Sequence, residues 1–157
     1  KLVKRLGLDN NQLADAARFV NENYPNITLE FDVEDKESIT AGAPSYLSIT
    51  LDRELEEDEE PHTQVHAPFF PVEKTENWWL VVVEDSTRSL LAIKRVTVGR
   101  QLKTRLEYVV PTPGKHELKL CLMCDSYLGV DQVPEFEVTA AEGMDVDDDE
   151  EEEGDDE

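Results

Sequence analysis

Residues 77–85 read Asn-Trp-Trp-Leu-Val-Val-Val-Glu-Asp and hold both tryptophans of the chain and its longest apolar run. Five of the six apolar residues are aromatic or β-branched, which favours a buried β-strand over a helix. Alternation along a strand gives this run two apolar faces. They are Trp79, Val81 and Val83 on one side, and Trp78, Leu80 and Val82 on the other. A half-exposed strand has one apolar face, so we expect one face to enter a core. The other face should be covered by another part of the chain or by a partner.

The net charge of −22 is unevenly distributed along the 157 residues. Twelve acidic residues and no basic ones lie between Glu142 and Glu157, which leaves −10 for the preceding part. Such a segment has too little apolar surface to offset the entropy of ordering, so residues 141–157 are predicted to be a disordered acidic tail. The acidity argues against a general nucleic-acid binder, because phosphate binding depends on Lys and Arg. It is compatible with basic protein partners.

One short helix and a series of short strands are predicted upstream of the tail. Asp9 or Asn10 caps a helix through residues 12–20, and Pro25 ends it. This helix either covers the second face of the tryptophan strand or belongs to a preceding domain. Strands are expected at residues 27–33, 47–51, 78–83, 90–98, 103–110, 118–124 and 133–138.

Seven to eight short strands with regular turns are typical of an antiparallel β-sandwich of the immunoglobulin or fibronectin type III kind. The predicted class is therefore mostly β. Residues 1–26 are assigned to a linker and a short α-helix, residues 27–140 to the sandwich, and residues 141–157 to the acidic tail.

Patterns for catalysis, cofactor binding or metal binding are missing from the sequence. Glu60, His62 and His66 lie close together, but their spacing and context do not match a metal site. No Gly-rich phosphate loop and no nucleophile elbow is present. No apolar stretch has the length of a membrane span. We expect no catalytic, cofactor or metal site, no membrane contact, and two reduced thiols at Cys121 and Cys124.

Aromatic residues near the tryptophan strand are the first candidates for docking a partner, because buried aromatics anchor interfaces. They are Phe69, Phe70 and Trp78, of which we expect at least one to belong to the core. A second candidate is a run of basic residues on two neighbouring strands, which pairing would gather into one patch. It comprises Lys94, Arg95, Arg100, Lys103 and Arg105. These either face outward to discourage edge pairing or contact an acidic partner or an RNA backbone.

The loop at residues 125–132 has two interpretations. In the first it is a packed corner, with Tyr127 inside and Gly129 in a positive-φ conformation. In the second it is an exposed recognition loop.

Six segments recur, in this order, in one known type of domain. They are Leu13-Ala-Asp-Ala-Ala-Arg-Phe19, Tyr24-Pro-Asn-Ile27, Pro68-Phe-Phe-Pro71, Trp78-Trp79, Leu91-Ala-Ile-Lys-Arg95 and Asp125-Ser-Tyr-Leu-Gly-Val-Asp-Gln132. The set resembles the carboxyl-terminal sandwich of the Sec63 homology unit and covers nearly everything from Leu13 to Val138. Within that class, the chain is most similar to the large RNA helicases of the spliceosomal U5 particle, at the end of their second helicase cassette.

The resemblance implies a parent that unwinds the U4/U6 RNA duplex and uses ATP and Mg²⁺ outside this segment. The segment itself would be a non-catalytic interaction and scaffolding domain for pre-mRNA splicing in the nucleus. Its partners would be other domains of its own helicase and spliceosomal proteins. Two alternatives stay open. One is the C-terminal domain of the endoplasmic-reticulum protein-translocation member of the same unit family, and the other is an acidic-tailed chaperone of basic proteins.

Overall fold

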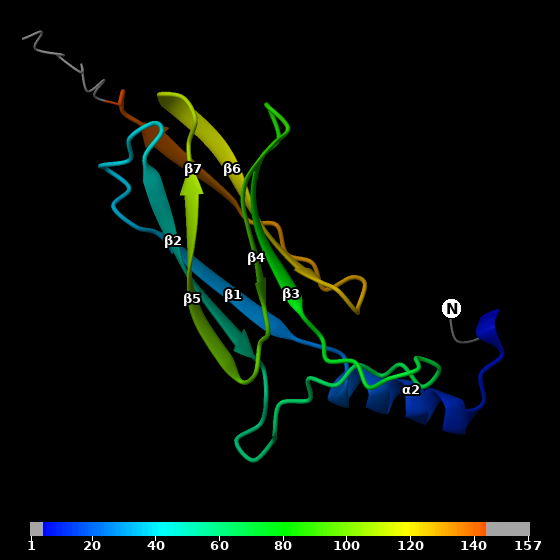
Figure 1. Ribbon diagram of the computed structural model, residues 1–157. Coiled ribbons are helices and arrows are strands. Elements are labelled where there is room, and N and C mark those ends of the chain that lie inside the picture. The colour runs from blue at the N-terminus through cyan, green and yellow to red at the C-terminus, as the bar shows by residue number, and fades with distance from the viewer. Residues whose placement is uncertain (1–4, 144–157) are drawn as a thin grey trace, which may run out of the picture.

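The computed structural model describes residues 5–143, in which a helix precedes seven strands arranged in two antiparallel sheets (Figure 1). The helix is α2 (Asn10–Glu22), and Asp9 caps it by accepting a hydrogen bond from the Gln12 backbone amide at 2.8 Å. The Gln12 side chain in turn accepts from the Asp9 amide, which completes a capping box. The helix predicted at residues 12–20 is confirmed and is two residues longer at each end.

The two sheets have the strand order of a fibronectin type III domain. The three-stranded sheet has the order β1-β2-β5, and the four-stranded sheet has the order β4-β3-β6-β7. The strands are β1 (Ile27–Val33), β2 (Pro44–Arg53), β3 (Trp78–Glu84), β4 (Ser89–Val96), β5 (Gln101–Val109), β6 (Gly114–Cys124) and β7 (Glu135–Ala140). The predicted sandwich is therefore confirmed. Ala141 still pairs with Thr40, and most of the predicted tail, residues 144–157, lies outside the described residues.

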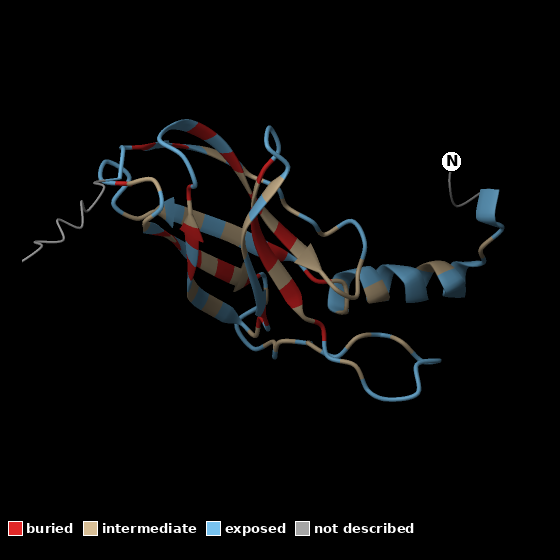
Figure 2. Cartoon of the chain, turned by 45° about the horizontal axis from the view of Figure 1, so that its top comes forward, coloured by how far each residue is buried: buried red, intermediate tan, exposed pale blue. Residues whose placement is uncertain are grey.

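The core lies between the two sheets and is built from the inward faces of all seven strands (Figure 2). On β3, the central strand, the inward residues are Trp78, Leu80 and Val82, each fully buried. They meet inward residues of β2 and β6 such as Leu47 and Leu120. Burial of large apolar side chains of this kind stabilises the fold by about 1.5–3 kcal/mol each.

The opposite face of β3 is apolar as well, and α2 does not cover it. Trp79, Val81 and Val83 point away from the core, next to Leu90 and Ile93 of β4. Among residues 5–143 no helix packs over this face, because α2 lies beyond the end of the sandwich at which β3 begins (Figure 1). Of the two roles expected for the helix, covering the second face of the tryptophan strand is therefore wrong.

Candidate docking surfaces

The segment between β2 and β3 folds back on itself as an arm, which we define as residues 63–76. Its two limbs pair through the Val65 amide donating to the Lys74 carbonyl at 2.7 Å and the Glu76 amide donating to the Thr63 carbonyl at 2.8 Å. At the tip, the Phe70 amide donates to the Ala67 carbonyl at 3.0 Å. Prolines at positions 68 and 71 bracket this turn and restrict its backbone. The arm is therefore a defined structure rather than a loose loop.

A buried ion pair anchors the arm to the core. The Arg53 guanidinium, at the end of β2, donates to the Glu76 carboxylate, and both side chains are almost fully buried. Arg53 also donates to the carbonyls of Val98 at 3.0 Å and Gly99 at 3.2 Å. The indole Nε1 of Trp78 donates to the same carboxylate oxygen at 3.3 Å. The Glu76 carboxylate thus connects the base of the arm to Arg53 at the end of β2 and to Trp78 in the core.

The arm presents apolar side chains to solvent at its tip. Phe69 is 100% exposed and Phe70 is 52% exposed, and Val72 beside them is also exposed. Both phenylalanines are therefore accessible to a partner. Trp78 does not, because none of its surface is accessible and it packs in the core. The prediction of Trp78 as a docking residue is corrected accordingly. Alternation allowed either tryptophan to face inward, and the structure places Trp78 there.

Four aromatic side chains join α2 to the sandwich, and we call Phe19, Tyr24, His66 and Tyr127 the aromatic joint. The ring of His66 lies 5.2 Å from that of Phe19, and the ring of Tyr127 lies 5.9 Å from that of Tyr24. The His66 amide donates to the Tyr127 hydroxyl at 3.1 Å. The arm, the helix and the loop at residues 125–132 therefore meet in a single cluster.

The loop at residues 125–132 is the packed corner of the first interpretation. Tyr127 packs in the aromatic joint, and Gly129 has a φ of +82°. The Tyr24 hydroxyl donates to the Leu128 carbonyl at 2.5 Å, which holds the corner against the end of α2. Leu128 at the tip of the loop is 94% exposed, and Gly129 and Asp131 are also exposed.

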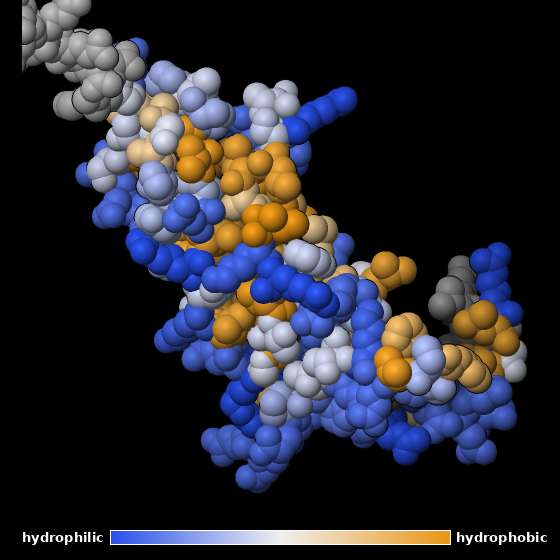
Figure 3. Space-filling model, in the orientation of Figure 1, coloured by the Kyte–Doolittle hydropathy of each residue, from blue (hydrophilic) through white to orange (hydrophobic). Residues whose placement is uncertain are grey.

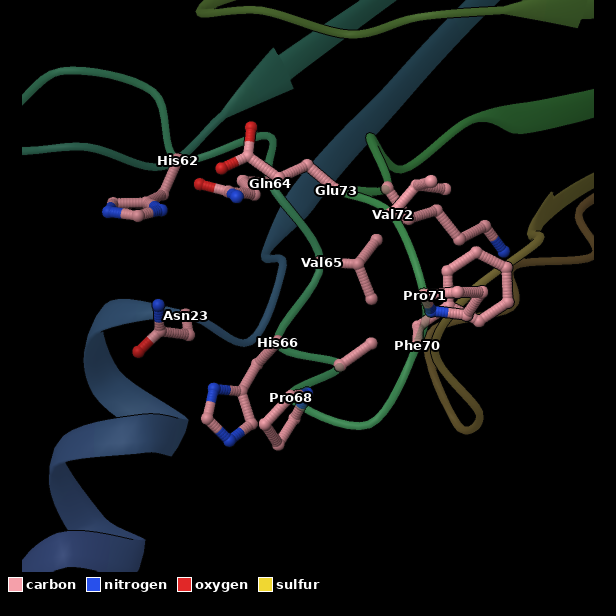
Figure 4. Close-up of a pocket in the computed structure, with 12 residues that line it drawn as sticks. Asn23, His62, Gln64, Val65, His66, Pro68, Phe70, Pro71, Val72 and Glu73 are labelled. Atoms are coloured by element: carbon pink, nitrogen blue, oxygen red, sulfur yellow. The ribbon is translucent and has the colours of Figure 1, made fainter.

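A hollow of about 500 Å³ lies between the arm and the end of α2. Figure 4 shows His66 and Pro68 on the side toward the helix, and Phe70 on the opposite side, near the loop at residues 125–132. Val65 points into its middle. The walls combine apolar side chains with the imidazole groups of His62 and His66 and the charged groups of Glu73 and Lys74. The hollow has room for a side chain of a partner.

The five basic residues do not form one patch, because β4 and β5 belong to different sheets. The expectation that these strands pair is wrong. Arg95 stacks on Trp79 on one outer face, whereas Arg105 stacks on Tyr46 on the other. Lys94 donates to Thr104 at 2.7 Å.

Several of these cations already have partners within the chain. Arg105 donates to Glu34 at 2.9 Å and thereby lowers the pKa of that carboxyl. Arg95 lies 3.5 Å from Asp125, and Arg100 donates to the Glu59 carbonyl. Lys103 is exposed. The geometry thus gives no continuous basic surface for an RNA backbone.

Residues 5–143 show no group of three or more His, Cys, Asp or Glu side chains placed to hold a metal ion. Within the same residues, no helix has the length and hydropathy of a membrane span. Cys121 and Cys124 are free, and burial raises the pKa of both thiols. They are therefore poor nucleophiles at neutral pH.

Two features of these surfaces were missed by reasoning from sequence. The Arg53–Glu76 pair was hidden because Arg53 begins an acidic run that is typical of a solvated loop, and Glu76 is distant from it in the sequence. The aromatic joint was hidden because its four members come from three distant segments. Their only signal was the recurrence of Tyr24, Phe19 and Tyr127 in the segments that carried the resemblance.

Comparison with known proteins relates the chain to a single family. The family model described as the Sec63 Brl domain matches residues 2–137. The pre-mRNA-splicing factor brr2 of Schizosaccharomyces pombe is 49% identical over 146 residues. These cover 93% of this chain and 7% of that protein. The U5 small nuclear ribonucleoprotein 200 kDa helicases of Drosophila melanogaster and Homo sapiens are 43% and 42% identical, over 87% of this chain and 6% of theirs.

Among solved structures, a CARDB domain from Pyrococcus furiosus aligns with a TM-score of 0.46 and 10% identity. The alignment covers 74% of this chain and 93% of that domain. The chain spans only 6–7% of the length of the curated relatives that it matches.

Proposed function

The chain belongs to the family of Sec63 Brl domains, and from this premise we propose that it is a non-catalytic interaction and scaffolding domain of a nuclear, spliceosomal RNA helicase. Its partners are other domains of that helicase and proteins of the splicing machinery. ATP and Mg²⁺ act elsewhere in the parent protein. The observation that carries the proposal is the arm, which holds Phe69 and Phe70 out in solvent at the end of the sandwich next to α2.

The arm supports docking for a physical reason. A fully exposed phenylalanine buries no apolar surface and therefore does not stabilise the fold. Large apolar side chains that become buried on binding are typical anchors of interfaces. The arm is also held at its base by the Arg53–Glu76 pair and near its tip by the contact of His66 with Phe19. A preorganised loop loses little conformational entropy when it binds. The arm thus combines an anchor with a rigid support.

Helix α2 supports the scaffolding part of the proposal. None of its residues is buried, although Leu13, Ala16, Ala17 and Val20 recur at helical spacing. The chain covers only 6–7% of its helicase relatives, so the parent has ample further sequence to cover this stripe. We infer that α2 packs against a neighbouring domain of the parent and that the aromatic joint sets the direction of the helix.

The test is capture from two extracts by the immobilised 157-residue chain. Nuclear and microsomal extracts are passed over the chain at moderate and at high salt, and the retained proteins are identified by mass spectrometry. We expect U5-particle proteins to survive high salt, because apolar contacts are little screened by ions. The Phe69→Ala/Phe70→Ala variant should lose them and keep its melting temperature within a few degrees.

Two other outcomes would overturn the proposal. Retention of protein-translocation components from microsomes alone would assign the chain to the endoplasmic-reticulum member of the family. Retention only of histones and similar basic proteins, released by salt, would indicate an acidic-tailed chaperone. A chain that ends at Ala141 serves as the control for the second case, because it lacks the acidic run from Glu142 to Glu157.

A further inference from the structure

The outer face of the four-stranded sheet is apolar over three strands, and we define it as the β3 face. Strand register places its side chains in three rows across β4, β3 and β6. The rows are Arg95–Trp79–Met123, Ile93–Val81–Cys121 and Leu90–Val83–Lys119. Ile93 and Leu90 are 57% and 59% exposed, whereas Trp79 and Val83 are half-buried and Val81 between them is 6% exposed. In the orientation of Figure 3, apolar surface lies around β4 and is crossed by a band of hydrophilic side chains.

The matching face of the other sheet is polar, so an apolar outer face is not a general property of this sandwich. Along β2, the outward residues are Tyr46, Ser48, Thr50 and Asp52. Opposite them on β5 lie Gln101, Lys103, Arg105 and Glu107. Exposed apolar side chains such as Leu90 and Ile93, grouped on one face of a sheet, mark interaction sites.

Carboxylates border the β3 face on the side of β6 and β7. Glu117 and Glu137 lie opposite each other on these strands, and Glu135 lies opposite Lys119. Together with Asp85 they line a hollow of about 500 Å³. Two lysines share this border: Lys119 contacts Asp85 and Glu135, and Lys115 lies 2.7 Å from Glu137. Four carboxylates against two lysines leave the border negative.

Two occupants of the β3 face conflict with these observations. Helix α2 of the same chain is held at the end of the sandwich, where Phe19 contacts His66. A second copy of the chain would bring two acidic borders together in a protein whose net charge is already −22, and like charges repel. A partner with apolar and basic residues has neither problem, because its charges complement the border.

We propose that the β3 face binds an amphipathic helix of a partner protein, with apolar residues on the three rows and Lys or Arg toward the β6–β7 border. A helix of about 10–12 Å diameter covers two to three strands at a spacing of about 4.8 Å. A sheet face offers no free backbone groups, so a helix, which satisfies its own, is the suitable ligand. This site is separate from the arm and goes beyond the proposed function.

The probe for this site is a fluorescent leucine–lysine peptide of about 14 residues that forms an amphipathic helix. A leucine–glutamate peptide and a lysine-only peptide serve as comparators. Binding is measured by fluorescence anisotropy at about 0.15 M salt. We expect the leucine–lysine peptide to bind at least about tenfold more tightly than either comparator. The preference should persist in a chain that ends at Ala141, where the acidic tail cannot act.

Two variants with matched exposure locate the site. Ile93→Glu should weaken leucine–lysine binding about tenfold, because it places a carboxylate in the central row. Leu6→Glu replaces an apolar residue outside the three rows that is 63% exposed and should leave binding unchanged. Glu117→Lys keeps the rows intact and reverses a border charge, so it should weaken binding about threefold even if the first variant were to misfold.

Several results would overturn the inference. One is equal binding by the Ile93→Glu, Glu117→Lys and Leu6→Glu chains. Another is equal binding of the leucine–glutamate peptide, which would remove the role of the acidic border. A third is equal binding of the lysine-only peptide to the shortened chain. Sedimentation that shows a dimer lost in Ile93→Glu would assign the β3 face to a second copy instead.

Discussion

Removal of the Arg53 guanidinium is the sharpest test of how the arm is held. In Arg53→Met the Glu76 carboxylate stays buried and keeps only the Trp78 indole as a donor. Its second oxygen has no hydrogen-bond partner among the described residues even in the native chain. An uncompensated buried charge costs about 3–5 kcal/mol. This is a large fraction of the roughly 5–15 kcal/mol by which a domain is stable.

The assay is urea unfolding followed by tryptophan fluorescence, with Trp78 beside the altered group as the reporter. The double variant Arg53→Met/Glu76→Leu removes both charges and should return to within about 1–2 kcal/mol of the native chain. Arg18→Met breaks an exposed ion pair with Asp15 and should hardly shift the midpoint, because water screens that pair. A loss below about 1 kcal/mol in Arg53→Met, or a double variant as unstable as the sum of its single changes, would refute the reasoning.

Three further predictions concern stability. Glu84 and His116 form a buried pair at 2.6 Å; hydrogen bonds from Thr87 and His116 lower the pKa of Glu84, and the bond to Glu84 raises the pKa of His116. The pair therefore stabilises the folded chain most between pH 4.5 and pH 6.5, the ordinary pKa values of the two side chains. Its contribution to the free energy of unfolding falls as the pH rises through the raised pKa of His116. It also falls as the pH drops through the lowered pKa of Glu84. The difference in melting temperature between the native chain and His116→Gln should shrink from pH 6 to pH 9, and a constant difference would contradict this. The hydroxyl of Tyr108 is buried without a partner among the described residues, and burial raises its pKa to about 12. Tyr108→Phe should therefore raise the unfolding free energy by up to about 1 kcal/mol in calorimetry, whereas a clear loss would mean that the hydroxyl is satisfied. Gly129→Ala meets a positive φ and a Cβ position 3.1 Å from the Tyr24 hydroxyl, so it should destabilise by about 1–2 kcal/mol. Gly99→Ala, in open space, should be nearly neutral.

The sandwich could be predicted from sequence because its signals are local. Alternation marked each strand, and Asp9 marked the start of the helix. The seven strands, and the two apolar faces of residues 78–83, follow from a period of two. Alternation does not predict which of the two faces of the strand points into the core. Trp78 and Trp79 were equivalent until the rest of the four-stranded sheet placed Trp78 inside.

The arrangement of strands into sheets depends on contacts between residues that are distant in the sequence. It determines whether the five basic residues lie on one face. Lys94 and Lys103 are nine positions apart, which suggests a hairpin. The chain crosses instead from one sheet to the other after β4, and the predicted patch is divided between two faces. Phe69 and Phe70 were easier to place, because Pro68 and Pro71 exclude a regular strand and keep the arm at the surface. Buried charges such as Glu76 carry no local signal.

The most direct measurement of the central claim, that the chain docks through the arm, is site-specific photocrosslinking. A benzophenone side chain is placed at Phe69, and in a matched control at Thr50 on the polar outer face of β2. Each chain is incubated in splicing-competent nuclear extract and irradiated, and its adducts are sequenced. The account predicts adducts with U5-particle proteins from position 69 and none from position 50. Adducts from position 50 alone, or equal yields from both positions, would contradict it.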